Sequence, residues 1–250
     1  MDRLKTYLAA RSIEDVWAFH LEVMKDYGFD RVFYAYNAFA TRPGGMVSPE
    51  DALFLTNYGQ TYVDEYVYSG VYRHGPLMKW ATRNVGATSW KTVWDEIQAE
   101  GLTDGLRRIA AVNKKHEISV GFTVSLPVAM TNANAGFGLC ARKGITQEEA
   151  DRIWAEGGDE IQTFCHVAHL CIMQLPASLK QQKLTDRQAE VLELVANGKS
   201  MQDIATILGR KIPTIEKHLR GARESLSVST TAQAVRKASV LNQIFRSLPE

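Results

Sequence analysis

Helix start and stop signals recur through the last part of the chain and restrict its fold more than any other feature. Thr185 and Gln188 form a capping box, in which each side chain satisfies a backbone N–H of the other residue. Ser200 is a second cap, and Pro213 suits the first turn of a third helix. The signals predict helices over 186–197, 201–208, 213–226 and from 231 onward. Because helices this short are stable only when packed together, the sequence predicts a small all-helical domain.

The second and third of these helices, joined by a tight turn at 209–212, have the arrangement of a helix-turn-helix. Apolar residues of the third helix are spaced to face the core, so its charged residues should point outward. The residues expected to contact DNA are Lys199, Ser200, Thr214, Glu216, Lys217, Arg220 and Arg223. Lys217 and Arg223 can reach phosphates, whereas Arg220 can bind a guanine edge through two hydrogen bonds. The alternative is a helical bundle that exposes these charges to water.

Charge is distributed unevenly along the 250-residue chain, although its net charge is only +1. From Pro176 onward, the chain has twelve Lys and Arg residues and seven Asp and Glu residues. Before Pro176, seventeen basic residues stand against twenty-one acidic ones. A basic module on a mildly acidic body is expected if only the C-terminal part contacts a polyanion such as DNA. Chance unevenness is the alternative interpretation.

A change of composition near Pro176 divides the chain. The segment 175–183 follows a long apolar helix, contains a proline and is polar, so we interpret it as a linker. The predicted domains are therefore 1–174 and 184–250.

The N-terminal part mixes helical and strand periodicity. Helices are predicted over 13–27, 102–115 and 147–175, and strands over 31–39, 118–128 and 136–142. The last two strands should be joined through a hairpin loop at 131–134. We predict an α+β fold, in which an α/β/α sandwich with a central antiparallel sheet precedes a four-helix helix-turn-helix domain.

A spaced set of residues extends over nearly all of 184–241. It comprises Leu184, Thr185, Arg187, Glu190, Val191, Leu192, Ala196, Gly198, Lys199, Ser200, Ile204, Ala205, Leu208, Thr214, Ile215, His218, Leu219, Leu226, Ala234 and Val235. This set resembles the LuxR-type DNA-binding domain. Gln188 replaces the family's usual Glu but retains the capping box. Lys211 replaces a Ser or Thr cap, which should weaken the start of the third helix by ~1 kcal/mol. Glu216 stands where the family often has a basic or polar base-reader, so the preferred DNA site should differ.

An aromatic series in the N-terminal part has a second characteristic spacing. Tyr58, Tyr62 and Tyr66 lie at i, i+4 and i+8, so we expect them on one helix face. The full pattern is Tyr62-x3-Tyr66-x8-Gly75-Pro76-x13-Trp90. Its intervals resemble the Trp-x3-Tyr-x8-Asp-Pro-x13-Trp pattern of the acyl-homoserine-lactone-binding domain of LuxR quorum-sensing regulators. The alternative is an aromatic stripe that only fills the core.

Two residues of this pattern differ from the family, where both positions contact the ligand. The resemblance implies that Tyr62 donates a phenol O–H where the family has an indole N–H. Gly75 replaces an Asp that accepts from the ligand amide, and an unpaired amide N–H costs roughly 1–3 kcal/mol. Gly75 should also open room for a larger ligand. Thr123 and Ser125 alternate along a strand, so both hydroxyls are expected in the pocket. The predicted ligand-binding residues are Tyr58, Tyr62, Tyr66, Gly75, Trp90, Thr123 and Ser125.

Other function classes find little support in the sequence. Cys165, His166, His169 and Cys171 suggest a metal site, but four ligands cannot converge from one short helical segment. Phosphate-binding, nucleophile-elbow and zinc-protease motifs are missing, so we expect no catalytic site, cofactor or metal. Because the sequence has neither a signal peptide nor a long apolar run, we expect a cytoplasmic protein with no membrane contact.

The resemblance implies a ligand-responsive transcription regulator that binds double-stranded DNA as a homodimer. Residues 1–174 would form the small-molecule sensor and dimerisation domain, and 184–250 the DNA-binding domain. The signal would be an acyl-homoserine lactone or a related small molecule. The alternative is a ligand-independent regulator of the same type, or a dominant partner that heterodimerises with another regulator. Neither function requires an enzyme.

Overall fold

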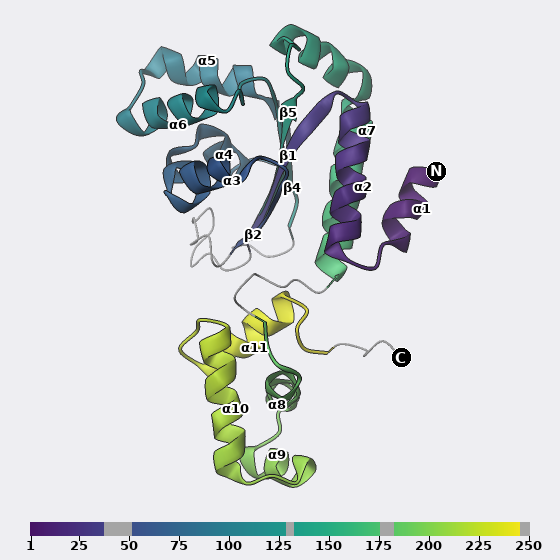
Figure 1. Ribbon diagram of the computed structural model, residues 1–250, viewed down its shortest axis with the longest axis vertical. Helices are drawn as coiled ribbons and strands as arrows, with labels where there is room; N and C mark the ends of the chain where they lie inside the picture. Colours follow the sequence, from purple (N-terminus) through teal and green to yellow (C-terminus); the bar gives the residue numbers. More distant parts are fainter. Residues whose placement is uncertain (38–51, 129–132, 176–182, 246–250) are drawn as a thin grey trace. The chain divides into compact units, whose positions relative to one another are not determined.

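The computed structural model describes residues 1–37, 52–128, 133–175 and 183–245 (Figure 1). The chain divides into two compact units, Met1–Cys171 and Ile172–Glu250. The first contains a sheet covered by helices and the second is helical, which confirms the predicted α+β class. Within the described ranges, no helix combines the length and the apolar character needed to span a membrane.

The sheet of the first unit is antiparallel throughout, as predicted. Its strands are β1 (Phe29–Asn37), β2 (Ala52–Thr56), β3 (Gly86–Ser89), β4 (Gly121–Leu126) and β5 (Asn134–Ala141), in the order β2-β1-β5-β4-β3. Side chains of β1 alternate between its faces because successive residues of a strand point in opposite directions. Val32, Tyr34 and Tyr36 are buried on one face, so Phe33 and Ala35 belong to the other.

Helices cover both faces of this sheet (Figure 1). On one side lie α2 (Ile13–Asp26) and α7 (Gln147–Gln174), with α1 (Asp2–Ala9) packed against α2. On the other side lie α3 (Gln60–Val63), the π-helical segment η2 (Asp64–Tyr68), the 3₁₀ segment η3 (Val71–His74), α4 (Pro76–Ala81), α5 (Trp90–Glu100) and α6 (Asp104–Lys115). This arrangement is the predicted sandwich. The layer from α3 to α6 positions the site described below.

The second unit contains α8 (Asp186–Ala196), α9 (Met201–Leu208), α10 (Ile212–Ser225) and α11 (Thr231–Val240). The capping box of Thr185 and Gln188 is formed, and Ser200 makes a second one with Asp203. Gly209 ends α9 with a φ of 60°, a left-handed conformation that favours glycine. The helices bury an apolar core that includes Leu192, Ile204 and Ile215.

Two local predictions differ from the structure. Tyr58 was expected on one helix with Tyr62 and Tyr66, but it lies before α3. Its backbone N–H donates to the Thr56 hydroxyl at 3.0 Å, and Gly59 begins the helix after it. The strand predicted over 118–128 is also shorter, since β4 ends at Leu126, directly before Pro127, which has no N–H to donate. Residues 38–39 and 131–132 of the predicted strand and loop lie outside the described residues.

Candidate functional site

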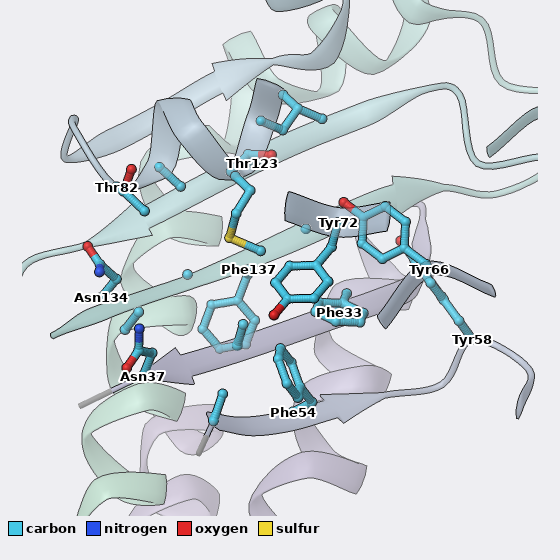
Figure 2. Close-up of a pocket in the computed structure, with 18 of the residues that line it drawn as sticks. Phe33, Asn37, Phe54, Tyr58, Tyr66, Tyr72, Thr82, Thr123, Asn134 and Phe137 are labelled. Carbon is cyan, nitrogen blue, oxygen red and sulfur yellow. The ribbon is translucent and has the colours of Figure 1, made fainter. Parts of the chain in front are cut away.

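A cavity of about 140 Å³ lies between the sheet and the helices from α3 to α6. Five of the residues predicted to bind a ligand line it: Tyr58, Tyr62, Tyr66, Trp90 and Thr123. Figure 2 shows aromatic side chains from the helical layer, such as Tyr72, facing aromatic side chains of the sheet, such as Phe33 and Phe54. The sequence pattern therefore identified one wall of an internal cavity.

The three tyrosines form a packed cluster at one end of this cavity. The rings of Tyr62 and Tyr66 are stacked with centroids 5.0 Å apart, and Tyr58 meets Tyr62 edge to face at 4.9 Å. The hydroxyl of Tyr62 donates to Asn113 Oδ1 at 3.3 Å. These contacts fix the tyrosine rings as a rigid end wall.

Trp90 and Thr123 form a buried pair on the neighbouring wall. The indole Nε1–H of Trp90 donates to Thr123 Oγ1 at 3.0 Å. Ser125 does not line the cavity, although it lies two residues farther along the same strand. Its hydroxyl donates to the Ala81 carbonyl of α4 at 2.7 Å, so α4 covers it. Of the two predicted hydroxyls, only that of Thr123 reaches the cavity.

Gly75 does not line the cavity, and it leaves no open space. A Cβ atom at this position would lie 2.8 Å from the Tyr72 carbonyl oxygen and 3.3 Å from Tyr66 Oη. Both distances are shorter than ordinary van der Waals contact, so the backbone of η3 and the Tyr66 hydroxyl already fill the position. The expectation that Gly75 opens room for a larger ligand is therefore wrong.

The described residues of the cavity lining carry no charge at neutral pH. They include no Asp, Glu, Lys, Arg or His. Burial raises the pKa of Tyr66 to about 12 and raises the pKa of Tyr58 and Tyr62 well above the ordinary value. All three phenols therefore keep their protons, and the cavity suits an uncharged molecule.

Sequence reasoning missed most of the sheet side of the cavity. Phe33, Ala35 and Asn37 of β1 alternate toward it, and Phe54 of β2 and Asn134 of β5 join them. The alternation along β1 was visible in the sequence and could have located this floor. The contributions of β2 and β5 depend on strand pairing, which a local pattern does not specify.

The second unit presents a candidate DNA-binding surface on α10. Glu216, Lys217 and Arg220 are exposed on the helix, and Lys199 is exposed before α9. Arg210 and Lys211 in the turn are exposed as well, and they extend the basic surface beyond the predicted residues. This surface is opposite the buried Ile215 and Leu219, as the helical spacing predicted.

Three predicted DNA contacts already have partners within the unit. Arg223 is half-buried, and its Nη1 donates to Thr231 Oγ1 at 3.1 Å. Ser200 donates from its hydroxyl to Asp203 at 2.6 Å and from its backbone N–H at 3.0 Å. Thr214 is half-buried, and its N–H donates to the Lys211 carbonyl. Lys211 caps α10 without a side-chain hydrogen bond, as expected.

Comparison with protein families matches each of the two units to a known domain family. The family model described as "Autoinducer binding domain" matches residues 12–172, and the model described as "Bacterial regulatory proteins, luxR family" matches residues 182–238. The chain belongs to the LuxR-type quorum-sensing transcription regulators. This LuxR-type regulator combines an autoinducer-binding domain with a DNA-binding domain, and members of its family are transcription regulators, not enzymes.

Curated relatives of this LuxR-type regulator are transcriptional activators. The chain is 24% identical over 210 residues to the transcriptional activator protein ExpR of Dickeya dadantii, a match that covers 78% of this chain and 80% of ExpR. It is 20% identical over 250 residues to the transcriptional activator protein AnoR of Acinetobacter nosocomialis, with 96% of each chain covered.

Solved structures share the fold of this LuxR-type regulator. The crystal structure of Escherichia coli SdiA matches it with a TM-score of 0.53 at 16% identity, covering 97% of this chain and 96% of SdiA. SdiA in complex with octanoyl-rac-glycerol matches with a TM-score of 0.51, also at 16% identity, covering 98% and 95% of the two chains. At this identity the likeness establishes the fold alone.

Proposed function

We propose that this LuxR-type regulator binds an uncharged small signal in the aromatic cavity and binds DNA as a homodimer through α10. The observation that carries the proposal is the aromatic cavity, whose described lining has no charged side chain, inside the unit that matches the autoinducer-binding model. SdiA, which has the same fold, has been solved in complex with octanoyl-rac-glycerol, itself an uncharged acyl compound. An acyl-homoserine lactone or a related neutral molecule is the proposed signal class.

The DNA contacts are proposed from the exposed residues of α10. Lys217 and Arg220 are both exposed, which supports a phosphate contact by Lys217 and a base-edge contact by Arg220 in the major groove. Glu216 accepts hydrogen bonds and suits a cytosine amino group. Two copies of α10, one from each protomer, would then read two half-sites about one helical turn apart.

Mass action supplies the link between the two sites. A signal that binds only the folded, dimer-competent sensor stabilises that state by RT ln(1 + [L]/Kd). DNA binding then rises with the population of competent dimers. The proposed place of action is the cytoplasm, where a bacterial regulator meets its DNA.

A ligand-independent regulator is the second candidate function. The observation that favours it is the size of the cavity, because about 140 Å³ is below the ~300–1,000 Å³ of common ligand pockets. In that case the stacked tyrosines would only fill the hydrophobic core. A protein that is dimeric and binds DNA equally well without any added signal would support this candidate.

Selection of binding sites from a random DNA pool tests the proposal. We expect the full chain with octanoyl-homoserine lactone to enrich a two-fold symmetric site with half-sites about one helical turn apart. Arg220→Ala should weaken binding to this site by about 1–3 kcal/mol and relax the sequence preference of the protein. Lys217→Ala should instead weaken binding to all DNA sequences by a similar factor. Enrichment of an asymmetric single site would contradict the homodimer. An unchanged sequence preference in the Arg220 variant would contradict its role as a base-reader.

A further inference from the structure

The register of the sheet gives the cavity a floor of small residues. Ala35 of β1 is paired with Gly136 of β5, and Phe33 is paired with Gly138. All four line the cavity, and paired residues of antiparallel strands point to the same face. A Cβ on Gly138 would meet Phe33 and Trp90 at 3.8 Å, so this glycine keeps the floor open between two aromatic side chains.

Two of the polar groups at the tyrosine end of the cavity are already bonded to other protein groups. Tyr62 donates to Asn113, and the Trp90 indole donates to Thr123. A ligand that used these groups would have to break protein hydrogen bonds, each worth about 0.5–1.5 kcal/mol. This end of the cavity is therefore suited to apolar parts of a ligand.

The opposite end of the cavity offers an unused donor. Asn134 lines the cavity, and its Nδ2 is buried and has no hydrogen-bond partner among the described residues. Asn134 is paired with Asn37 across the two strands, and Figure 2 shows both with Thr82 at the end away from Tyr58 and Tyr66. Buried polar groups in folded proteins nearly always have a partner. A hydrogen-bond acceptor on a ligand at this end would give Asn134 Nδ2 the partner that it lacks.

The size of the cavity restricts what can lie between these ends. Its volume of about 140 Å³ is close to the ~150 Å³ of an engineered apolar cavity that binds benzene. Phe33, Phe54 and Tyr72 supply ring faces and edges around it. Aromatic rings prefer offset or edge-to-face contacts with one another, which these side chains can provide to a flat guest.

We propose that the cavity is built for an uncharged, single-ring aromatic molecule that carries a carbonyl or another acceptor. The ring lies among Phe33, Phe54 and Tyr72, and the acceptor binds Asn134 Nδ2. This inference rests on the proposed function, because it names the ligand class of the same cavity. It places the polar group of the ligand at the strand ends of β1 and β5, away from the tyrosine cluster.

Acetophenone and ethylbenzene provide the test, because they have nearly the same shape and only acetophenone has an acceptor. Binding to the full chain is followed by tryptophan fluorescence, since Trp90 lines the cavity and every tryptophan precedes residue 172. We expect acetophenone to bind roughly tenfold more tightly than ethylbenzene, as one good hydrogen bond allows. Asn134→Ala should abolish this preference, so that the two compounds bind about equally, with the affinity for ethylbenzene unchanged.

Equal affinities of the two compounds for the wild-type chain would overturn the inference, and this result does not depend on any variant folding. A tenfold preference that persists in Asn134→Ala would also overturn it. Octanoyl-homoserine lactone is measured in parallel. If the lactone binds and acetophenone does not, the single-ring inference fails and the proposed function stands. If no compound binds, both fail.

Discussion

At the scale of single residues, the packing beside the cavity includes positions where one more atom would not fit. Gly75 is the sharpest example, because a Cβ there would lie 2.8 Å from the Tyr72 carbonyl oxygen. The sequence showed only that position 75 has no side chain. It did not show that Tyr66 and the backbone of η3 occupy the place.

Substitution of Gly75 tests this close packing. Gly75→Ala should lower the free energy of unfolding of the first unit, Met1–Cys171, here called the sensor unit. The expected decrease is about 1–3 kcal/mol, the usual cost of overpacking. Gly59→Ala is the matched control, because a Cβ at Gly59 meets nothing within 4 Å and its φ is negative. Urea unfolding followed by tryptophan fluorescence measures both. Equal stabilities of the two variants would contradict the packing described for Gly75.

Two buried histidines predict how the sensor unit responds to acid. His20 Nδ1 lies 2.7 Å from Tyr7 Oη, and burial lowers the pKa of His20 to about 3. His169 Nδ1 lies 2.9 Å from Tyr34 Oη, and burial, with His166 as a second cause, lowers the pKa of His169 to about 4. In the unfolded chain both regain a pKa of about 6.5.

The unfolded chain therefore binds protons that the folded chain does not, between about pH 6.5 and pH 4. The free energy of unfolding should fall as pH falls through this window, by up to roughly 1.4 kcal/mol per pH unit for each histidine. Urea unfolding at a series of pH values measures the slope. The double substitution His20→Gln and His169→Gln should flatten it, and His74→Gln, at an exposed position, should not. A slope that survives the double substitution would assign the acid response to other groups.

At the scale of elements, the sequence predicted what local chemistry decides. Thr185 and Ser200 cap their helices as expected, because a cap is a contact between neighbours in the chain. Strands β2 and β3 were not predicted, since each is short and is held by a partner distant in sequence. Tyr58 was placed on a helix because its spacing to Tyr62 and Tyr66 is helical, but α3 begins only after Gly59. The contributions of β2 and β5 to the cavity were missed because a local pattern does not specify strand pairing.

The uncapped start of α10 gives a prediction at this scale. Lys211 makes no side-chain cap hydrogen bond, so Lys211→Ser should stabilise the first turn by ~1 kcal/mol. Hydrogen exchange of the Thr214 amide in the full chain should slow about fivefold, since 1.4 kcal/mol corresponds to tenfold. Lys211→Ala removes the same charge without adding a cap and should give no protection. Equal exchange in the two variants would show that the helix start does not lack a cap.

At the scale of the whole molecule, one unit contains a cavity whose described lining is uncharged, and the other unit has an exposed basic helix. The sequence predicted this division from charge distribution and from the two family patterns. It did not predict the chemistry of the signal, because that depends on which lining groups are already bonded to one another. The central claim is that an uncharged small molecule enters the cavity and stabilises the sensor unit.

The most direct test is the thermal midpoint of the sensor unit, measured by tryptophan fluorescence with and without octanoyl-homoserine lactone, octanoyl-rac-glycerol and acetophenone. We predict that at least one compound raises the midpoint by several degrees at a hundredfold excess over its Kd. Ala35→Leu, which fills the cavity floor, should abolish the rise. A flat response to all three compounds, or an equal rise in the Ala35 variant, would contradict the account.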